Sequence, residues 1–333
     1  MTRIGIYSSA HLHAGAYAAA LRALPGVELT GVYDPEAKRG KAAAKSLGAR
    51  YAASPEQLFD LGLDGVIICS ENVRHRGDAE RALDAGLGVL CEKPLATKPA
   101  DALAMVRAAA RARRPLMTAF PCRYSTPLRE ARRLMREGAL GAVLAAQGTN
   151  RGTNPGGWFV DPELSGGGAV MDHTVHVVDV LRWILEDEVA SVYAEATGAS
   201  GEVEDHGLLL FRFEQGTGAS LDCSWSRPGQ SFPTWGDVTL SLIGEQGNLH
   251  IDAFRQHAML YSERAKKGIQ VDFADDINAG LIADFVAVLR EEKIPEVDGI
   301  DGLRAVEVVD AAYRSIASAR AATVRRAALG SRS

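Results

Sequence analysis

Three polar side chains have the types and the spacing that proton transfer requires. Asp172 and His176 stand four residues apart in an apolar stretch, so a helix would present both from one face. Histidine titrates near neutral pH and suits a general base, and a nearby lysine ammonium stabilises a developing alkoxide. We therefore predict that His176 removes a proton from an alcohol, or returns it in the reverse direction. Lys93 stabilises the charge, and Asp172 binds substrate hydroxyls or orients the site.

The helix that would carry two of these residues, predicted over Ala169–Leu185, admits other interpretations. The run from Asp172 through His173 to His176, followed by Asp179, could suggest a metal site. No Glu or Cys stands at metal-site spacing, however, and we predict no metal. A histidine in an amphipathic helix is also often only a packing residue. His173 points about 100° away from Asp172 around the helix and is a candidate supporting residue.

The stretch after the first predicted strand has the position of a dinucleotide-binding loop without its glycines. It reads Ser8-Ser9-Ala10-His11-Leu12-His13-Ala14 where such folds have G-x-G-x-x-G. Serine and alanine are still small enough for backbone N–H groups at a helix N-terminus to approach a pyrophosphate. We expect cofactor contacts from Ser8, Ser9, Ala10, His11 and His13. The two histidines face the pyrophosphate or the substrate, or they only pack at the helix start.

Asp34 ends the second predicted strand, where a carboxylate accepts hydrogen bonds from the adenosine ribose. This position favours NAD over NADP, because a ribose phosphate would be repelled. Lys38 and Arg39 are close enough in sequence to bind that phosphate, so NADP stays an alternative. An Asp-Pro pair is equally typical of a turn that ends a strand.

The elements that must position these residues fall into two groups, which we assign to residues 1–122 and 123–333. In the first group, apolar strands alternate with helices, which is typical of a doubly wound parallel sheet. Its predicted strands are Arg3–Ser8, Val27–Tyr33, Gly65–Ser70, Gly88–Cys91 and Pro115–Phe120, and its predicted helices are Ala14–Leu24, Glu36–Leu47, His75–Ala85 and Pro99–Ala112.

The second group has adjacent strands joined by turns, which predicts an α+β domain with a large, mostly antiparallel sheet. Its predicted strands are Ala142–Asn150, Val189–Thr197, His206–Glu214, Ala219–Trp225, Val238–Ile243, Asn248–Asp252 and Ala258–Tyr261. Besides the central helix, the predicted helices are Pro127–Glu137, Asp275–Glu292 and Ile300–Ala327. The basic end of the last helix would suit the helix dipole.

Composition narrows the classes of function. The 333 residues carry a net charge of −5 without a basic block, which argues against a nucleic-acid partner. The 4 cysteines lie far apart, as expected in a reducing compartment. The chain opens directly into a strand without the apolar region of a signal peptide, and no apolar run is long enough to span a membrane. We expect a cytoplasmic protein with a small-molecule substrate.

Several short motifs are spread over essentially the whole chain, among them a Glu-Lys-Pro element and a Gly-Gly-x(4)-Asp-x(3)-His element. Their residues are Asp64–Cys69, Asn72, His75, Ala85-Gly86, Cys91–Ala96, Arg123-Tyr124, Gly141, Trp158, Gly166–Gly168, Asp172 and His176. In order and spacing these motifs resemble the glucose-fructose oxidoreductase/inositol dehydrogenase (Gfo/Idh/MocA) family, for which the two named elements together are specific. The chain departs at the loop Ser8–His13 and at Glu71, where the family usually has proline.

The resemblance implies NAD(P)-dependent oxidation or reduction of a sugar, cyclitol or related polyol, with the lysine and the histidine in the catalytic centre. It also implies that the C-terminal sheet forms subunit contacts, so we expect a homodimer or homotetramer. We add Ser70, Asn72, His75, Glu92 and Lys93 to the predicted cofactor contacts. The predicted substrate contacts are Lys93, Arg123, Asn150, Arg151, Trp158, Asp172, His173 and His176, although Arg123 with Tyr124 has packing at the domain junction as its alternative role.

Two further hypotheses differ in chemistry. A glycosidase-like enzyme of the same fold would use bound NAD transiently, with no net formation of NADH. A non-catalytic regulator would bind NAD and turn over no polyol. The joint presence of Lys93, Asp172 and His176 favours an enzyme over a regulator.

Overall fold

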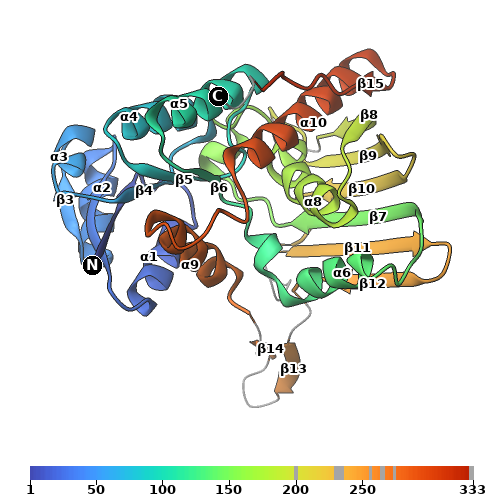
Figure 1. Ribbon diagram of the computed structural model, residues 1–333, viewed down its shortest axis with the longest axis horizontal. Helices are drawn as coiled ribbons and strands as arrows, with labels where there is room; N and C mark the ends of the chain where they lie inside the picture. The colour runs from blue at the N-terminus through green and yellow to red at the C-terminus, as the bar shows by residue number, and fades with distance from the viewer. Residues whose placement is uncertain (199–201, 229–235, 255–256, 263–266, 273–274, 330–333) are drawn as a thin grey trace. The chain divides into compact units, whose positions relative to one another are not determined.

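The computed structural model describes residues 1–198, 202–228, 236–254, 257–262, 267–272 and 275–329 (Figure 1). The chain divides into two compact units. The first unit comprises Met1–Pro121 with the later segments Glu163–Gly166 and Asn278–Val306. The second unit comprises Cys122–Pro162, Gly167–Ile277 and Glu307–Ser333. Two later segments of the chain therefore join the predicted dinucleotide-binding region.

The first unit contains a parallel sheet of 6 strands in the order β3-β2-β1-β4-β5-β6. The order reverses at β1, as it does in dinucleotide-binding folds. The strands are β1 (Thr2–Tyr7), β2 (Val27–Tyr33), β3 (Arg50–Ala52), β4 (Gly65–Ile68), β5 (Gly88–Cys91) and β6 (Leu116–Thr118). Every residue of β4 and β5 is buried, which is why these strands read as continuous apolar runs.

Helices cover both faces of this sheet. In Figure 1, α4 and α5 lie on one side of the sheet, and α1 and α9 lie on the other. Leu289 and Phe285 of α9 pack against Gly65 of β4. The helices are α1 (Ala14–Ala23), α2 (Ala37–Ser46), α3 (Pro55–Phe59), α4 (His75–Asp84), α5 (Pro99–Ala112), α7 (Pro162–Ser165) and α9 (Ile277–Leu289), with a 3-10 turn, η1 (Asn72–Arg74).

The second unit is built on a sheet of 7 strands in the order β12-β11-β7-β10-β9-β8-β15. All its pairings are antiparallel except β7 with β10. The strands are β7 (Val143–Gly152), β8 (Val189–Thr197), β9 (His206–Phe213), β10 (Gly218–Ser224), β11 (Gly236–Gly244), β12 (Asn248–Asp252) and β15 (Ala322–Thr323). A separate pair is formed by β13 (His257–Ser262) and β14 (Lys267–Asp272).

The helix α8 (Ala169–Leu185) lies across one face of this sheet, next to α6 (Thr126–Arg136) (Figure 1). The other helical elements are η2 (Pro121–Tyr124), η3 (Gly157–Val160) and α10 (Gly299–Ser318). Most side chains of α8 are buried, including Val175, Val178 and Leu181. A helix buried on most of its surface holds its polar side chains in fixed positions.

The predicted fold class is confirmed, but the end of the last helix was predicted wrongly. We expected a helix to Ala327, whereas α10 ends at Ser318 and Ala319 has the positive φ of 51°. The hydroxyl of Ser318 donates to the carbonyl of Arg314 at 2.8 Å, so a side chain competes for a helical acceptor at this end. Residues 322–323 then pair with β8, which helical periodicity cannot reveal.

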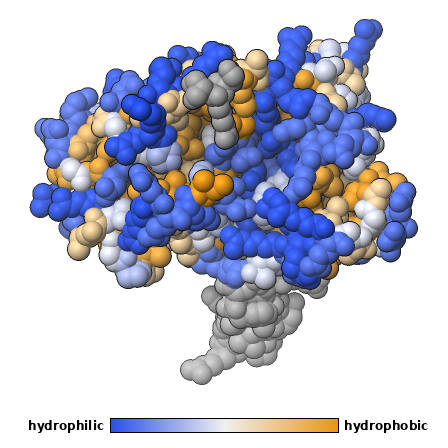
Figure 2. Space-filling view, viewed as in Figure 1, coloured by the Kyte–Doolittle hydropathy of each residue, from blue (hydrophilic) through white to orange (hydrophobic). Residues whose placement is uncertain are grey.

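The described surface is largely hydrophilic in one view (Figure 2), and the thiols are buried. In the view of Figure 2, hydrophilic residues cover much of the described surface. None of the helices in the described part of the chain has the length and hydrophobicity to cross a membrane. All 4 cysteines are buried and none forms a disulfide, so each packs as a small apolar residue.

Candidate functional site

The loop between β1 and α1 in the first unit is held by one carboxylate. Asp34 Oδ2 accepts the backbone N–H of Ser9 at 2.7 Å and the hydroxyls of Ser9 and Ser8 at 3.0 and 3.3 Å. Ser8 has a φ of 67°, in the left-handed region that favours glycine. The bonds to Asp34 thus hold the backbone in the form that glycine normally supplies at this position.

Asp34 also pairs with Arg39, whose charge is shared among several carboxylates. Arg39 Nε donates to Asp34 at 2.8 Å, and its other nitrogens lie 3.3 Å from Glu71 and 3.7 Å from Glu36. Burial alone would raise the pKa of Asp34, but the hydrogen bonds from Arg39, Ser9 and Glu36 lower it. The Asp34 carboxylate is therefore ionised. Glu71, where the chain departs from the family pattern, contacts the same arginine and so belongs to the same ion-pair network.

Three predicted cofactor residues follow β4, namely Ser70, Asn72 and His75, and all three have internal contacts. The ring nitrogens of His75 lie 2.9 Å from the Pro94 carbonyl and 3.1 Å from the Ser70 carbonyl. Burial lowers the pKa of His75, so the ring is neutral and donates one of these bonds. Ser70 Oγ donates to Asp78 at 2.7 Å. Contacts of Ser70 and His75 with a cofactor stay predictions.

Asn72 has a buried acceptor available for a ligand. Its Nδ2 donates to the Ser165 carbonyl at 2.9 Å, whereas its Oδ1 accepts no hydrogen bond from the described residues. A buried acceptor without a donor is costly, so a donor from a bound molecule would stabilise it. The carboxamide of a nicotinamide is a donor of this kind. The parallel sheet, the β1–α1 loop held by Asp34 and this buried acceptor are together suited to bind NAD.

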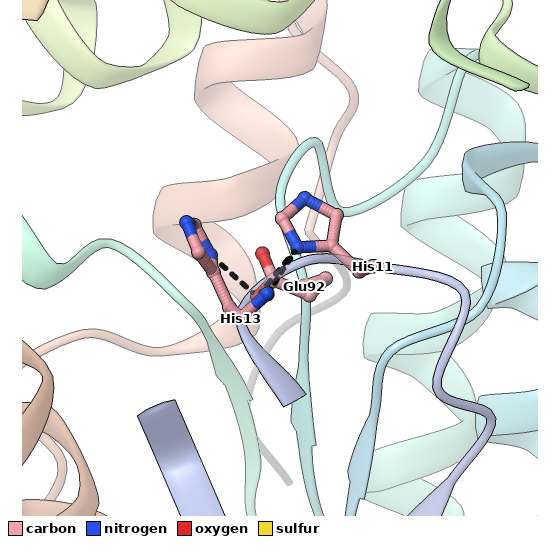
Figure 3. Close-up of side chains that lie close together, drawn as sticks. All are labelled: His11, His13 and Glu92. Carbon is pink, nitrogen blue, oxygen red and sulfur yellow. Dashed lines mark hydrogen bonds and ion pairs between the residues drawn. The ribbon is translucent and has the colours of Figure 1, made fainter. Parts of the chain in front are cut away.

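Glu92 and Lys93 emerge at the end of β5, where doubly wound sheets bind ligands. Glu92 is fully buried and Lys93 is nearly so. Glu92 Oε1 lies 2.9 Å from His13 Nδ1 and 3.4 Å from His11 Nδ1, and Tyr17 donates to it at 2.6 Å. Figure 3 shows how His11, His13 and Glu92 are grouped. Burial alone would raise the pKa of Glu92, but attraction to His11 and His13 and the bond from His13 hold it far below its usual range.

In the second unit, the residues just before α8 pack closely against two other parts of the chain, at Glu204 and Tyr313. A Cβ on Gly168 would lie 1.9 Å from the Glu204 carbonyl, and one on Gly167 would lie 2.0 Å from Tyr313 Oη. The Glu204 carboxylate accepts the backbone N–H groups of Gly168 and Val170 at 2.9 and 3.1 Å, and the Tyr313 hydroxyl at 2.7 Å. Gly167 and Gly168 therefore lie directly against this cap.

A series of polar contacts in the first turns of α8 surrounds Asp172. Asn150 O lies 2.8 Å from His173 Nδ1, and His173 Nε2 lies 3.2 Å from Asp172 Oδ2. Trp225 Nε1 donates to the same carboxylate oxygen at 3.1 Å. A carbonyl can only accept, so His173 Nδ1 donates to Asn150, and His173 Nε2 faces the Asp172 carboxylate. His173 therefore holds Asp172 in position.

His176 lies one turn beyond Asp172 in α8, as the spacing predicted, and is 6% exposed. Asp172 and His176 are thus brought together on one helix of the second unit. Lys93 belongs to the first unit.

The other predicted substrate residues have contacts within the second unit. Arg123 forms a buried, two-point ion pair with Asp179 of α8, at 2.9 and 2.6 Å. This contact lies within the second unit, and the role of Arg123 at the domain junction stays a prediction. Arg151 Nε donates to Asp237 at 3.2 Å, and the Trp158 ring stacks on Phe159 with centroids 3.9 Å apart. Their contacts with a substrate stay predictions.

Asn150 lies fully buried on β7, and its Nδ2 donates to the Asp237 carbonyl at 3.0 Å. Its Oδ1 accepts no hydrogen bond from the described residues. Like Asn72 in the first unit, it therefore has a buried acceptor for a bound donor.

Sequence reasoning missed three residues that support the site: Trp225, Glu204 and Tyr313. Trp225 follows β10, and its indole N–H reaches a carboxylate 53 positions earlier in the chain. Glu204 and Tyr313 meet at the start of α8 from separate elements. No local motif marks these residues, because each acts through a contact between distant parts of the chain.

Comparisons with known proteins agree with this architecture. The family model described as "Oxidoreductase family, NAD-binding Rossmann fold" matches residues 4–120. The model of the GFO/IDH/MocA C-terminal domain matches residues 128–250. Inositol 2-dehydrogenase 3 of Saccharopolyspora erythraea is 30% identical over 69% of this chain and 67% of its own length.

Other relatives match nearly the whole length. D-apiose dehydrogenase of Paraburkholderia graminis is 26% identical over 95% of this chain and 86% of its own. The crystal structure of GenD2 from gentamicin A biosynthesis, in complex with NAD, superimposes with a TM-score of 0.89 at 25% identity, covering 98% of this chain and 97% of that one. The chain therefore belongs to the Gfo/Idh/MocA family of NAD-binding oxidoreductases.

Proposed function

We propose that this protein oxidises or reduces a secondary alcohol of a sugar, cyclitol or related polyol, using NAD. The arrangement of Asp172 carries the proposal, because His173 and Trp225 fix its carboxylate one helical turn from His176. A carboxylate and an imidazole held on one rigid helix can bind and deprotonate a hydroxyl group. The related proteins named as inositol and D-apiose dehydrogenases support a polyol substrate.

In the proposed reaction, His176 accepts the hydroxyl proton as the carbon–hydrogen bond breaks. The Lys93 ammonium stabilises the negative charge that develops on the oxygen. Asp172 accepts a hydrogen bond from a neighbouring hydroxyl and so orients the substrate. When bound, NAD supplies the acceptor for the hydride. In the reverse direction His176 returns the proton to the carbonyl oxygen.

A cavity of about 380 Å³ in the second unit supports a neutral polyol over a sugar acid. Its described lining includes two carboxylates, Glu202 and Asp205, and no cationic side chain; Asn154, Gly156, Val160, Val203 and Trp225 complete it. Trp225 is the residue that contacts Asp172, so this cavity adjoins the proposed substrate position. Carboxylates bind hydroxyl groups and repel a substrate carboxylate or phosphate.

The test is a screen of aldoses, inositols and their keto or lactone products with NAD and NADP, read as the change in reduced nicotinamide. We expect turnover of a neutral polyol and weaker turnover of the matched sugar acid. NAD retained through purification without net NADH formation would instead indicate transient redox chemistry. Cofactor binding with no turnover across the panel would contradict the proposal.

A further inference from the structure

His11, His13 and Glu92 converge in the first unit in a way that hydrogen bonding alone does not explain. Among the residues that the structure describes, they are the group of at least three His, Cys, Asp or Glu whose potential ligand atoms all lie within 4.8 Å of one another. In Figure 3 both rings point toward the Glu92 carboxylate, the histidines from the β1–α1 loop and the glutamate from the end of β5.

The orientation of the His11 ring is the decisive detail. The backbone N–H of His13 donates to His11 Nδ1 at 3.2 Å, so this nitrogen presents its lone pair. The same nitrogen lies 3.4 Å from Glu92 Oε1, which accepts a hydrogen bond from Tyr17. A cation between these two atoms would be bound by the nitrogen lone pair and the carboxylate together.

We propose that His11, His13 and Glu92 bind a divalent transition-metal ion of the zinc type. Two imidazole nitrogens and one carboxylate form a ligand set that zinc uses with a position left open. Ligands about 2.1 Å from a tetrahedral ion lie about 3.4 Å apart. The separations of 3.4 and 2.9 Å from Glu92 Oε1 to the two nitrogens match this requirement within small side-chain movements.

Surrounding contacts orient the ligands. The Tyr17 hydroxyl and the Lys93 backbone N–H donate to the two oxygens of Glu92, at 2.6 and 3.1 Å. Contacts of this kind fix the direction of a metal ligand. The His13 side chain is 36% exposed, which leaves a path for an ion.

This inference departs from the prediction of no metal. That prediction considered the spacing within one helix, whereas here the glutamate stands 79 positions after His13. Only the fold brings the ligands together.

The experiment measures metal binding without NAD or substrate, so its outcome is independent of the proposed function. Protein stripped with a chelator is titrated with Zn²⁺, and bound metal is determined after gel filtration. Co²⁺ is added separately to record the visible bands of a site with nitrogen and oxygen ligands. We expect about one ion per chain in the wild type, and at least a tenfold weaker affinity in Tyr17→Phe.

His13→Ala should lose both the bound zinc and the cobalt bands. The matched control His250→Ala removes an exposed histidine of β12 and should bind as the wild type does. Thermal unfolding in metal-free buffer verifies that each variant folds. A folded wild type that binds neither ion, or a His13→Ala protein that binds as much as the control, would overturn the proposal. Either result would leave His11, His13 and Glu92 as a polar cluster that binds no metal.

Discussion

The proposed mechanism gives His176 and Lys93 different tasks in one step, one moving a proton and the other stabilising charge. Replacing either with alanine should lower turnover by roughly a hundredfold or more, the usual scale for such losses. NAD affinity should change much less with His176→Ala. His250→Ala, at an exposed histidine of β12, is the matched control. Turnover, cofactor titration and thermal unfolding on the same samples would separate a catalytic role from a structural one. Normal turnover by His176→Ala would exclude the mechanism.

Cofactor choice depends on the charges around Arg39. Asp34, Glu36 and Glu71 all lie near its guanidinium group, so little positive charge is left for a ribose phosphate. We expect NAD to bind more tightly than NADP. Glu71→Gln removes one of these carboxylates and should improve NADP binding relative to NAD by roughly three- to tenfold, since Arg39 is partly exposed and the effect is screened.

The matched control for Glu71→Gln is Glu80→Gln, which removes a carboxylate paired with Arg76 on α4. Calorimetric titration with both cofactors gives the ratio of affinities. Tighter binding of NADP by the wild type, or an unchanged ratio in Glu71→Gln, would contradict this account of specificity.

At the scale of elements, the N-terminus of α8 depends on Glu204. Its carboxylate accepts two backbone N–H groups and the Tyr313 hydroxyl, at a helix end that favours negative charge. Glu204→Gln should destabilise the protein by about 1 kcal/mol, the usual value of a helix cap. It should also lower kcat, because Asp172 and His176 lie on this helix. Glu202→Gln, at an exposed neighbour, is the control for stability in chemical unfolding.

The β1–α1 loop should respond to pH through Asp34. Its folded pKa lies below the ordinary value of 3.8, so ionisation stabilises the fold above that value and the contribution is lost as the pH falls through the folded pKa. The stability difference between wild type and Asp34→Asn should therefore shrink on acidification from pH 5. Denaturant unfolding without cofactor at several pH values measures it, with Asp60→Asn as the exposed control. A difference that stays constant or grows would be incompatible with an ionised, bonded Asp34.

Periodicity predicted the elements that carry the site, but not the contacts that complete it. The apolar run Ala169–Leu185 became α8 with the predicted bounds, because a helix buried on most faces has a continuous signal. The short β3 and α3 were not predicted, since few residues define them. The Asp172–Trp225 and His13–Glu92 contacts join residues far apart, and only the folded chain reveals them.

At the scale of the whole molecule, the open face of the second sheet should bind a second copy of the chain. Leu208 and Leu210 of β9 are 63% and 56% exposed, and a hollow of about 490 Å³ lies beside them. Large apolar side chains exposed side by side are typical of interfaces, and a two-fold axis would bring the same patch from both subunits together.

Leu208→Glu would then place an unpaired carboxylate in the contact twice, and should weaken association at least tenfold. Ile294→Glu, at an exposed position after α9, is the matched control. Sedimentation at micromolar concentration should show an oligomer for wild type and control and a monomer for Leu208→Glu; a monomeric wild type would refute the interface.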